Sequence, residues 1–215
     1  MESEIQNQNS APQQAVPEGT AVEPPKSGRS QIWPFIADFL KVFLIALAII
    51  VPVRWFLFQP FVVTGDSMKP NFHDGDYLII DEITYRIRPP GRGEVIVMRF
   101  PNDPSQFFIK RIVGLPGERV VIENGRVTIY DSKNPKGIVL NESYLPNNNV
   151  TYGNIDVTLD GQDFFVLGDN RLSSSDSRIW GALPRKDIVG RVYVRALPLP
   201  DFKLFANQNY NFSTP

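Results

Sequence analysis

The chain contains no cysteine and only one histidine, His73, among its 215 residues. The lack of cysteine excludes thiol catalysis, disulfides and zinc sites built on thiolates. It also suits an oxidising compartment, where a free thiol is a liability. A single histidine cannot form a metal site by itself, so no metal and no cofactor are expected. An enzyme of this composition either uses His73 as its base or works without histidine.

The chain also has no marked excess of charge of either sign. The formal net charge is −1, whereas a nucleic-acid-binding face needs a clear excess of basic residues. No nucleic-acid partner is therefore expected, and the sequence leaves the oligomeric state open. With 42% hydrophobic residues, the chain can bury one core of useful size rather than two.

Residues 1–32 are rich in Gln, Pro, Ala, Ser and Glu. Such a composition cannot bury enough apolar surface to offset the entropy lost on ordering, so a disordered tail is predicted. Residues 203–215 end in an asparagine-rich stretch and are predicted to form a second tail.

Residues 33–58 form an apolar segment whose only charges are Asp38, Lys41 and Arg54. Its uninterrupted core, residues 42–53, is short for a membrane-spanning helix, which needs about 20 apolar residues. Lys41 and Arg54 lie near the two ends, where long basic side chains can reach the interface. Asp38 and Lys41 can also pair on one face of a helix. The segment is therefore predicted to be a single transmembrane anchor.

A buried helix and a cleaved signal peptide are the two alternatives for this segment. Trp33 and Trp55 bracket it, as aromatic residues do at membrane interfaces. No small-x-small cleavage site follows the apolar run, which argues against removal. Lys26 and Arg29 precede it and favour an N-terminus on the inner side, with the rest of the chain outside.

Residues 59–202 are predicted to form an all-β domain. Asn124–Gly125 lies between two alternating runs and predicts a hairpin with a type I′ turn. Residues 131–162 are interpreted as a polar excursion. The expected strands are rich in β-branched and aromatic residues; they are Tyr77–Asp81, Glu94–Phe100, Phe107–Val113, Arg119–Ile122, Arg126–Tyr130, Phe164–Leu167 and Ile188–Ala196.

Ser67 lies in the sequence Gly-Asp-Ser-Met, a short distance ahead of a predicted strand. A nearby glycine lets another stretch of backbone approach closely, and a sharp turn exposes the hydroxyl. Both features suit a nucleophile. On its own, however, such a serine is more often an ordinary turn residue.

Lys110 and Arg111 are adjacent in a predicted apolar strand and therefore point to opposite faces. One of the two cations must be pressed against apolar neighbours, whichever face is inside. Desolvation lowers the pKa of a lysine, whereas arginine keeps its proton. A lysine whose pKa falls from about 10.4 toward neutrality can act as the general base for a serine hydroxyl. The alternative is a half-exposed strand with two solvated cations.

A loop dense in Asp, Asn, Arg and Ser follows the strand that ends at Leu167. Asp169, Arg171, Asp176 and Arg178 offer two pairs of opposite charge. Such a loop can be a rigid platform that orients a neighbouring side chain, or an ordinary polar loop. It lacks the Asp-x-Asp-x-Asp-Gly spacing of a calcium-binding loop, so no metal site is predicted here.

Taken together, four stretches resemble the type I signal peptidases, membrane-bound Ser–Lys proteases that remove signal peptides from exported proteins. The stretches are GDSMKPNF (65–72), RGEVIVMRFP (92–101), FIKRIVGLPGE (108–118) and GDNRLSSSDSRIWG (168–181). Their order and spacing carry the resemblance, which covers about residues 33–196. The resemblance implies a mainly β catalytic domain of antiparallel sheets, preceded by one N-terminal transmembrane helix.

The resemblance implies that Ser67 is the nucleophile and Lys110 the general base. Ser174 would bond and orient the Lys110 amine, and Met68 would help to wall the substrate cleft. Gly65 stands where some members place a Ser or Thr that donates to the oxyanion hole, which leaves the Ser67 backbone N–H as the one assigned donor. The other supporting residues belong to a charged scaffold, in which Arg111 is expected to pair with Asp169; its further members are Asn170, Arg171, Asp176 and Arg178.

Four further positions depart from the family pattern. Asn71 and Phe72 follow Pro70 where the usual reading is Pro-Thr-Leu, and Leu172 and Ser173 replace Asp-Asn. None of them is one of the two catalytic residues. The implied substrates are preproteins cut after a small-x-small stretch. The implied site of action is the outer or lumenal side of a bacterial plasma membrane or a thylakoid membrane, with the bilayer as a further partner.

Two rival functions remain. The Ser–Lys self-cleaving repressors share the two catalytic residues and a β-fold, but they have no membrane anchor, and this chain has no pair of DNA-binding helices ahead of its body. A catalytically dead, membrane-tethered adaptor would not need to keep Ser67, Lys110 and Ser174. His73 lies six residues after Ser67 in a turn and is interpreted as a surface residue rather than a base.

Overall fold

The computed structural model describes residues 29–56, 58–146, 150–205 and 212–213. Contacts divide the chain into two units, with the boundary after Ala46. Most of the predicted N-terminal tail, residues 1–28, lies outside the described residues. Its last part, residues 29–32, is helical, and the candidate membrane span begins at Trp33 within the same helix.

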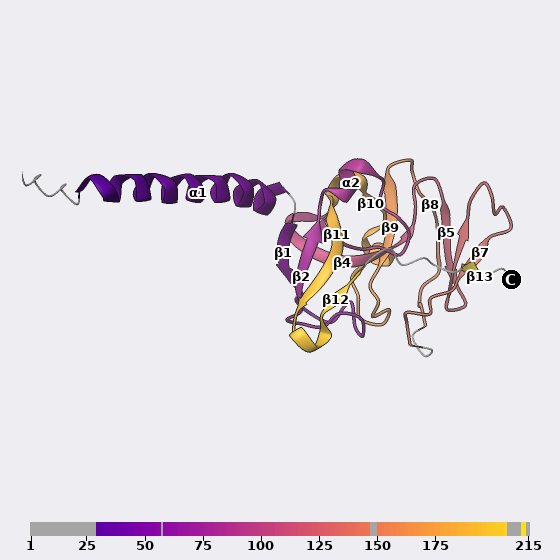
Figure 1. Ribbon diagram of the computed structural model, residues 1–215. Helices are drawn as coiled ribbons and strands as arrows, with labels where there is room; N and C mark the ends of the chain where they lie inside the picture. The colour runs from indigo at the N-terminus through magenta and orange to yellow at the C-terminus, as the bar shows by residue number, and fades with distance from the viewer. Residues whose placement is uncertain (1–28, 57, 147–149, 206–211, 214–215) are drawn as a thin grey trace, which may run out of the picture. The chain divides into compact units, whose positions relative to one another are not determined.

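Helix α1 (Arg29–Phe56) contains the predicted anchor (Figure 1). Its Trp33–Val51 stretch is long and apolar enough to cross a membrane. The Lys41 amine lies 3.5 Å from the Asp38 carboxylate, which confirms the predicted pair. The predicted segment ended at residue 58, but the helix ends at Phe56 and Phe58 already belongs to a strand.

The larger of two antiparallel sheets has eight strands, which run in the order β1-β2-β11-β3-β4-β9-β10, with β12 also paired to β11. Pro60 lies in β1, at one edge of this sheet, where a residue without an N–H group is tolerated. The strands are β1 (Phe58–Val62), β2 (Tyr77–Asp81), β3 (Val95–Phe100), β4 (Asp103–Gly114), β9 (Asp163–Leu167), β10 (Leu183–Pro184), β11 (Ile188–Leu197) and β12 (Lys203–Leu204).

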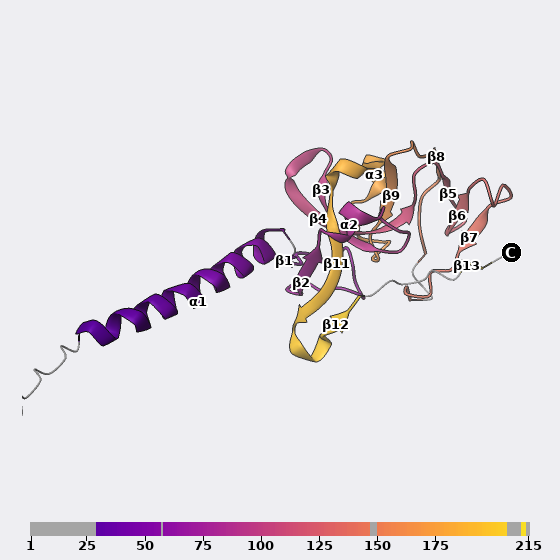
Figure 2. The same cartoon turned by 45° about the horizontal axis from the view of Figure 1, so that its top comes forward.

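A second sheet of five strands has the order β13-β7-β6-β5-β8. In both views of the ribbon, its strands lie at the opposite side of the body from β1 and β2 (Figures 1 and 2). Asn124 and Gly125, with φ of 50° and 75°, form the β5–β6 turn, which confirms the predicted type I′ geometry. The strands are β5 (Arg119–Glu123), β6 (Arg126–Tyr130), β7 (Ile138–Leu140), β8 (Ile155–Thr158) and β13 (Phe212–Ser213).

Two predictions about irregular segments are wrong. Residues 131–162 contain β7 and β8, which pair with β6 and β5. The predicted C-terminal tail, residues 203–215, contains β12 and β13, which pair with β11 and β7. These strands have two to four residues each, too short to show an alternating pattern, and they form because an existing strand supplies their hydrogen-bond partners.

Short helices fill connections of the larger sheet. They are α2 (Thr84–Ile87), α3 (Ser177–Trp180) and the 3-10 turns η1 (Arg185–Asp187) and η2 (Leu199–Asp201). The Asp176 side chain accepts a hydrogen bond from the Arg178 backbone N–H and so caps the start of α3.

The larger sheet is buried on both faces at its centre. Along β3, Val95 and Val97 belong to one hydrophobic cluster, and Ile96 and Met98 to another. A third cluster joins the end of β4, β9 and the smaller sheet. Strand β4 therefore has apolar layers on both sides, which is the environment that its two adjacent cations enter.

Gly114, at the end of β4, is expected to tolerate no side chain. An added Cβ would lie 2.6 Å from Val120 Cγ2 and 2.9 Å from Phe165 Cβ, inside the core between the two sheets. We expect Gly114→Ala to lower the free energy of unfolding by about 1–3 kcal/mol, because overpacking forces neighbours apart. Chemical denaturation in detergent measures this. Gly161→Ala is the control, since a Cβ there meets nothing within 4 Å; equal stability of the two variants would contradict the packing described here.

Candidate active site

Ser67 lies in the segment between β1 and β2, and buried neighbours hold this segment in place. Met68 and Phe72 are 1% and 0% exposed and pack in the cluster beneath the larger sheet. The Ser67 carbonyl oxygen accepts a hydrogen bond of 2.9 Å from the backbone N–H of Asn170. The Asn170 side chain donates to the Asp66 carbonyl at 3.1 Å. Ser67 is thus held in place by the packing of Met68 and Phe72 and by hydrogen bonds to the loop after β9.

Gly65 adopts a backbone conformation that residues with side chains rarely adopt, with φ of 88°. Its N–H donates to Asp74 Oδ1 at 2.7 Å. The glycine is therefore required by the local backbone, and a Ser or Thr here would be strained. No side chain at this position can supply a second oxyanion donor.

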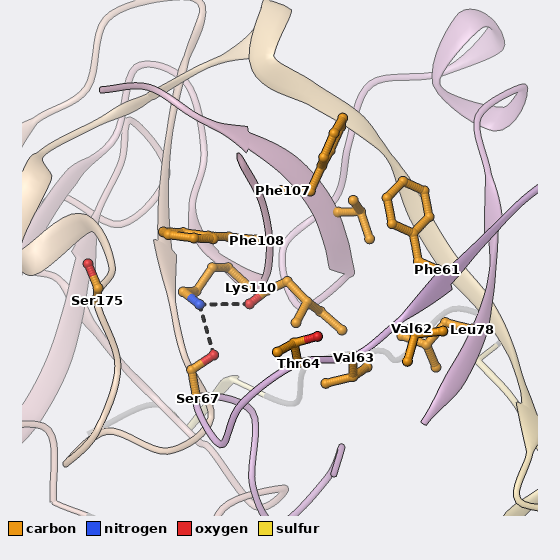
Figure 3. Close-up of a pocket in the computed structure, with 12 residues that line it drawn as sticks. Phe61, Val62, Val63, Thr64, Ser67, Leu78, Phe107, Phe108, Lys110 and Ser175 are labelled. Atoms are coloured by element: carbon orange, nitrogen blue, oxygen red, sulfur yellow. Dashed lines mark hydrogen bonds between the residues drawn. The ribbon is translucent and has the colours of Figure 1, made fainter. Parts of the chain in front are cut away.

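Lys110 comes from β4 and is 3% exposed. Its Nζ donates hydrogen bonds of 2.9 Å to Ser67 Oγ and of 2.9 Å to the Ile109 carbonyl oxygen. It also lies 5.1 Å from the centre of the Phe108 ring. The close-up shows the lysine reaching Ser67 beneath this ring (Figure 3).

Burial lowers the pKa of Lys110 to about 8, because the ammonium form has lost its hydration. The carboxylates of Asp176 and Asp169 act in the opposite direction and raise this pKa. Desolvation wins, so a substantial fraction of the amine is neutral near pH 8.

Arg111 is equally buried, at 3% exposed, on the opposite side of the strand. Its Nε and Nη2 donate to the two carboxylate oxygens of Asp169 at 2.7 and 2.5 Å, which confirms the predicted pair. The sequence required only one of the two cations to be buried. Both are buried. Arg111 keeps its charge beside the Asp169 carboxylate, whereas burial lowers the pKa of Lys110 so that its amine can be neutral.

The loop after β9 contributes further ion pairs. Asp176 pairs with Arg178 at 2.8 Å, and Asp176 Oδ2 also accepts from the Gly168 N–H at 3.1 Å. Arg171 pairs with Glu142, outside this loop, so the four charges are not paired solely with one another as the sequence suggested. The loop is nevertheless the hydrogen-bonded platform that was predicted.

Two predicted contacts differ in the structure. Ser174 Oγ is buried and has no hydrogen-bond partner among the described residues, so its predicted bond to Lys110 is absent. The hydroxyl lies against Gly168, whereas Lys110 is bonded to Ser67 and Ile109. Met68 does not line the cleft; it is buried, and its sulfur accepts from the Asp169 N–H at 3.5 Å. Met68 thus supports the loop from below.

A cleft of about 250 Å³ opens beside Ser67 and Lys110 (Figure 3). The sequence motifs did not identify its walls. The alternation of Phe61 and Val63 just ahead of Ser67 was the sequence pattern that could have indicated one wall. The β1–β2 pairing brings Leu78 beside Phe61. His73 is exposed, and it is not among the lining residues. The lining is mostly apolar: Phe61, Val62, Val63, Thr64, Leu78, Val97, Phe107, Phe108 and Ile109, with Ser175 at the end near Lys110.

Residues 36–197 match the family described as signal peptidase, peptidase S26. The chain belongs to the signal peptidase family. It is therefore a peptidase whose substrates carry signal peptides, and the mainly antiparallel fold expected from the resemblance is confirmed.

Two relatives agree with this assignment. The chain is 35% identical to a probable signal peptidase I-1 from Synechocystis sp. over 77% of its own length and 85% of that protein. It is 34% identical to a signal peptidase I from Bacillus caldolyticus, over 85% and 97% of the two chains. A crystal structure of a signal peptidase I from Enterococcus faecalis V583 matches 49% of this chain and 97% of that chain, with 27% identity and a TM-score of 0.41.

Gly168 is expected to be essential for the geometry of this signal peptidase site. A Cβ there would contact Ser174 Oγ and lie 2.5 Å from the Ser67 carbonyl oxygen. We expect Gly168→Ala to displace Ser67 and to lower the cleavage rate by about tenfold or more, because small misplacements of reacting groups are costly. Cleavage of a preprotein by detergent-solubilised enzyme tests this. Gly91→Ala, whose added Cβ makes only ordinary contacts from 3.6 Å outward, is the control; similar rates for both variants would refute the expectation.

Proposed function

We propose that this protein is a membrane-anchored serine endopeptidase that removes N-terminal signal peptides, with Ser67 as nucleophile and Lys110 as general base. The observation that carries the proposal is the 2.9 Å contact between the Lys110 amine and the Ser67 hydroxyl, made by a lysine that is 3% exposed. A nucleophile within hydrogen-bond reach of a base is the arrangement that activates a serine.

The proposed reaction begins with a neutral Lys110. The Ser67 oxygen attacks the scissile carbonyl carbon while the amine accepts the hydroxyl proton. The Ser67 backbone N–H stabilises the oxyanion of the tetrahedral intermediate. The resulting ammonium then gives its proton to the leaving amine, which frees the new N-terminus and leaves the signal peptide as an ester on Ser67. Water, deprotonated by Lys110, hydrolyses the ester.

Neighbouring groups support the base role of Lys110. The Ile109 carbonyl accepts from the amine and fixes its direction, with Nζ 2.9 Å from Ser67 Oγ. In the neutral form of the amine, the Ser67 O–H donates to its lone pair. Asp169 and Asp176 keep the pKa near 8 rather than lower, which preserves the basicity that proton abstraction requires. Ser174 remains a proposed supporting residue, by resemblance to the family.

The proposed substrates are preproteins cut after a small-x-small stretch, by resemblance to the family. The cleft has a mostly apolar lining, from Phe61 to Ile109, which suits an extended segment with small apolar side chains. We further propose that helix α1 spans a bacterial plasma membrane or a thylakoid membrane once. The N-terminus would lie inside and the catalytic domain on the outer or lumenal side, as Lys26 and Arg29 favour.

Cleavage should depend on pH through Lys110. Because the amine must be neutral, the rate is expected to rise with pH through about 8, the pKa of Lys110, and to level off above it. Initial rates on a preprotein from about pH 6 to pH 10 measure this. A rate that stays constant from acid to neutral pH would contradict the base role.

Removing the amine provides the direct test. Lys110→Ala should fold but lose cleavage by several orders of magnitude, about as Ser67→Ala does, because the two residues act as one unit. The measurement is cleavage of a small-x-small preprotein in detergent, with the folding of each variant checked. Lys136→Ala is the matched control, because this lysine is exposed in the turn before β7.

The outcomes separate the rival functions. Equal cleavage by wild type and Lys110→Ala would show that Lys110 is only a strand residue. A folded wild type that cuts no preprotein would instead favour a membrane-tethered adaptor.

A further inference from the structure

Arg171 is a buried cation whose carboxylate partner comes from a distant part of the chain. It is 2% exposed and lies in the loop after β9. Its Nη1 and Nη2 groups donate to the Glu142 carboxylate, with 2.8 Å between Nη1 and Oε2. The same groups donate to the Thr151 hydroxyl and, at 2.9 Å, to the Tyr144 hydroxyl. Residues of the segment between β7 and β8 thus supply partners for a charge beside the candidate active site.

Tyr144 makes three further contacts, one within its own segment and two to other parts of the chain. Its hydroxyl donates to Glu142 Oε1 at 2.7 Å. Its ring lies 4.2 Å from the centre of the Arg111 guanidinium, next to Lys110 in β4. Its carbonyl oxygen accepts from the Asn71 side chain at 3.1 Å, and the same amide donates to Asp169 Oδ2 at 2.9 Å.

These contacts join three segments that must stay aligned for Ser67 and Lys110 to meet. Asn71 belongs to the segment that carries Ser67, and Arg111 follows Lys110 in β4. Arg171 lies in the loop after β9, which is hydrogen-bonded to the Ser67 carbonyl. None of Glu142, Tyr144 and Arg171 lines the cleft described for residues 61–175. Their influence on the reaction must therefore pass through the alignment of other residues.

Glu142 supplies the carboxylate that compensates the buried charge of Arg171, while Arg171 Nε donates to the Gly168 carbonyl at 3.1 Å. A buried arginine that loses its carboxylate partner is strongly destabilised. The Asp169 carboxylate, which holds Arg111, also acts electrostatically on Arg171. Without Glu142, Arg171 would compete with Arg111 for Asp169 and shift the loop that contacts Ser67.

We propose that Glu142 and Tyr144 are positioning residues for the peptidase reaction, which they serve by fastening the β7–β8 connection to Arg171 and Arg111. This inference rests on the proposed function. The connection between the strands of the smaller sheet thereby becomes part of the catalytic machinery, although it contributes no group to the cleft.

The test is the kinetics of Glu142→Gln, which keeps the shape and removes the charge. We expect kcat for preprotein cleavage to fall by about ten- to a hundredfold, since misalignment of reacting groups has effects of this size. KM should stay within about twofold, because the cleft wall is intact. Glu142→Asp, which keeps the carboxylate, should recover part of the lost kcat. All variants are measured as the full chain in detergent.

The pH dependence of the same variant supplies a second readout. The charged groups that act on Lys110 are Asp176 and Asp169, which pair with Arg178 and Arg111. Removing the Glu142 charge leaves Arg171 uncompensated, which disfavours the ammonium form of Lys110. The midpoint of the rise in rate with pH should therefore move to lower pH, by about half a unit. A purely structural role would not move it.

A matched control comes from another ion pair of the smaller sheet. Asp156 accepts from Arg119 at 2.7 and 2.5 Å, but both side chains are about half exposed, at 56% and 47%. Asp156→Asn removes the same charge from the same sheet and should leave kcat and the midpoint unchanged. Tyr144→Phe, which keeps the ring on Arg111, should lower kcat by only about threefold. This variant tests the proposal if Glu142→Gln fails to fold.

The outcomes are distinguishable from those that test the proposed function. If wild type cleaves and folded Glu142→Gln keeps the wild-type kcat and midpoint, the inference is overturned while the peptidase stands. A loss that only follows the unfolded fraction in thermal melts would also overturn it. If wild type itself cuts no preprotein, the proposed function fails first and this inference with it.

Discussion

Arg111 and Asp169 form a buried ion pair that joins the strand carrying Lys110 to the loop that contacts Ser67. Their two parallel hydrogen bonds of 2.7 and 2.5 Å lie in a region where both side chains are less than 5% exposed. Such a pair offsets its desolvation cost only when the remaining donors and acceptors are also satisfied. Arg111 Nη1 donates to the Gly93 carbonyl at 2.9 Å, and Asp169 accepts from Asn71. Arg111 follows Lys110 in β4, and Asp169 precedes Asn170, whose N–H donates to the Ser67 carbonyl. The contact between Ser67 and Lys110 therefore depends on this ion pair.

Burial of Lys110 next to Ser67 lowers the stability of the folded protein. Its pKa of about 8, against an ordinary value of 10.5, corresponds to a loss of stability on the order of 3 kcal/mol. The unfolded chain keeps its proton up to the higher value, so the loss is present in full below pH 8 and disappears as the pH rises toward 10.5. The two neighbouring carboxylates limit the loss without removing it. A buried lysine with no carboxylate in contact, beside a fully paired arginine, is a functional rather than a stabilising choice.

The sequence predicted the long strands and the charged motifs, because each has a local physical signature. Their β-branched and aromatic residues identified β2 and β6 with the right bounds, and Asn124–Gly125 identified the hairpin turn. The Arg111–Asp169 pair followed from the family resemblance. By contrast, β7 and β8 were missed, because three or four residues become a strand only when a partner strand is present. The partner of Arg171 was missed for the same reason: nothing local to Glu142 indicates which cation, 29 positions away, will need it.

Two of the departures from the family pattern, Gly65 and Asn71, lie where the structure provides an alternative contact. Gly65 gives up a side-chain hydroxyl, and its positive φ lets its N–H reach Asp74. Asn71 stands where the family usually has threonine, and its longer amide reaches both Asp169 and the Tyr144 carbonyl. A threonine hydroxyl is a single donor and could not serve both acceptors at once. The replacement therefore ties the segment of Ser67 to the β7–β8 connection as well as to the loop after β9. The Tyr144 carbonyl is thereby linked to Arg111, the neighbour of Lys110, through two hydrogen bonds and one ion pair.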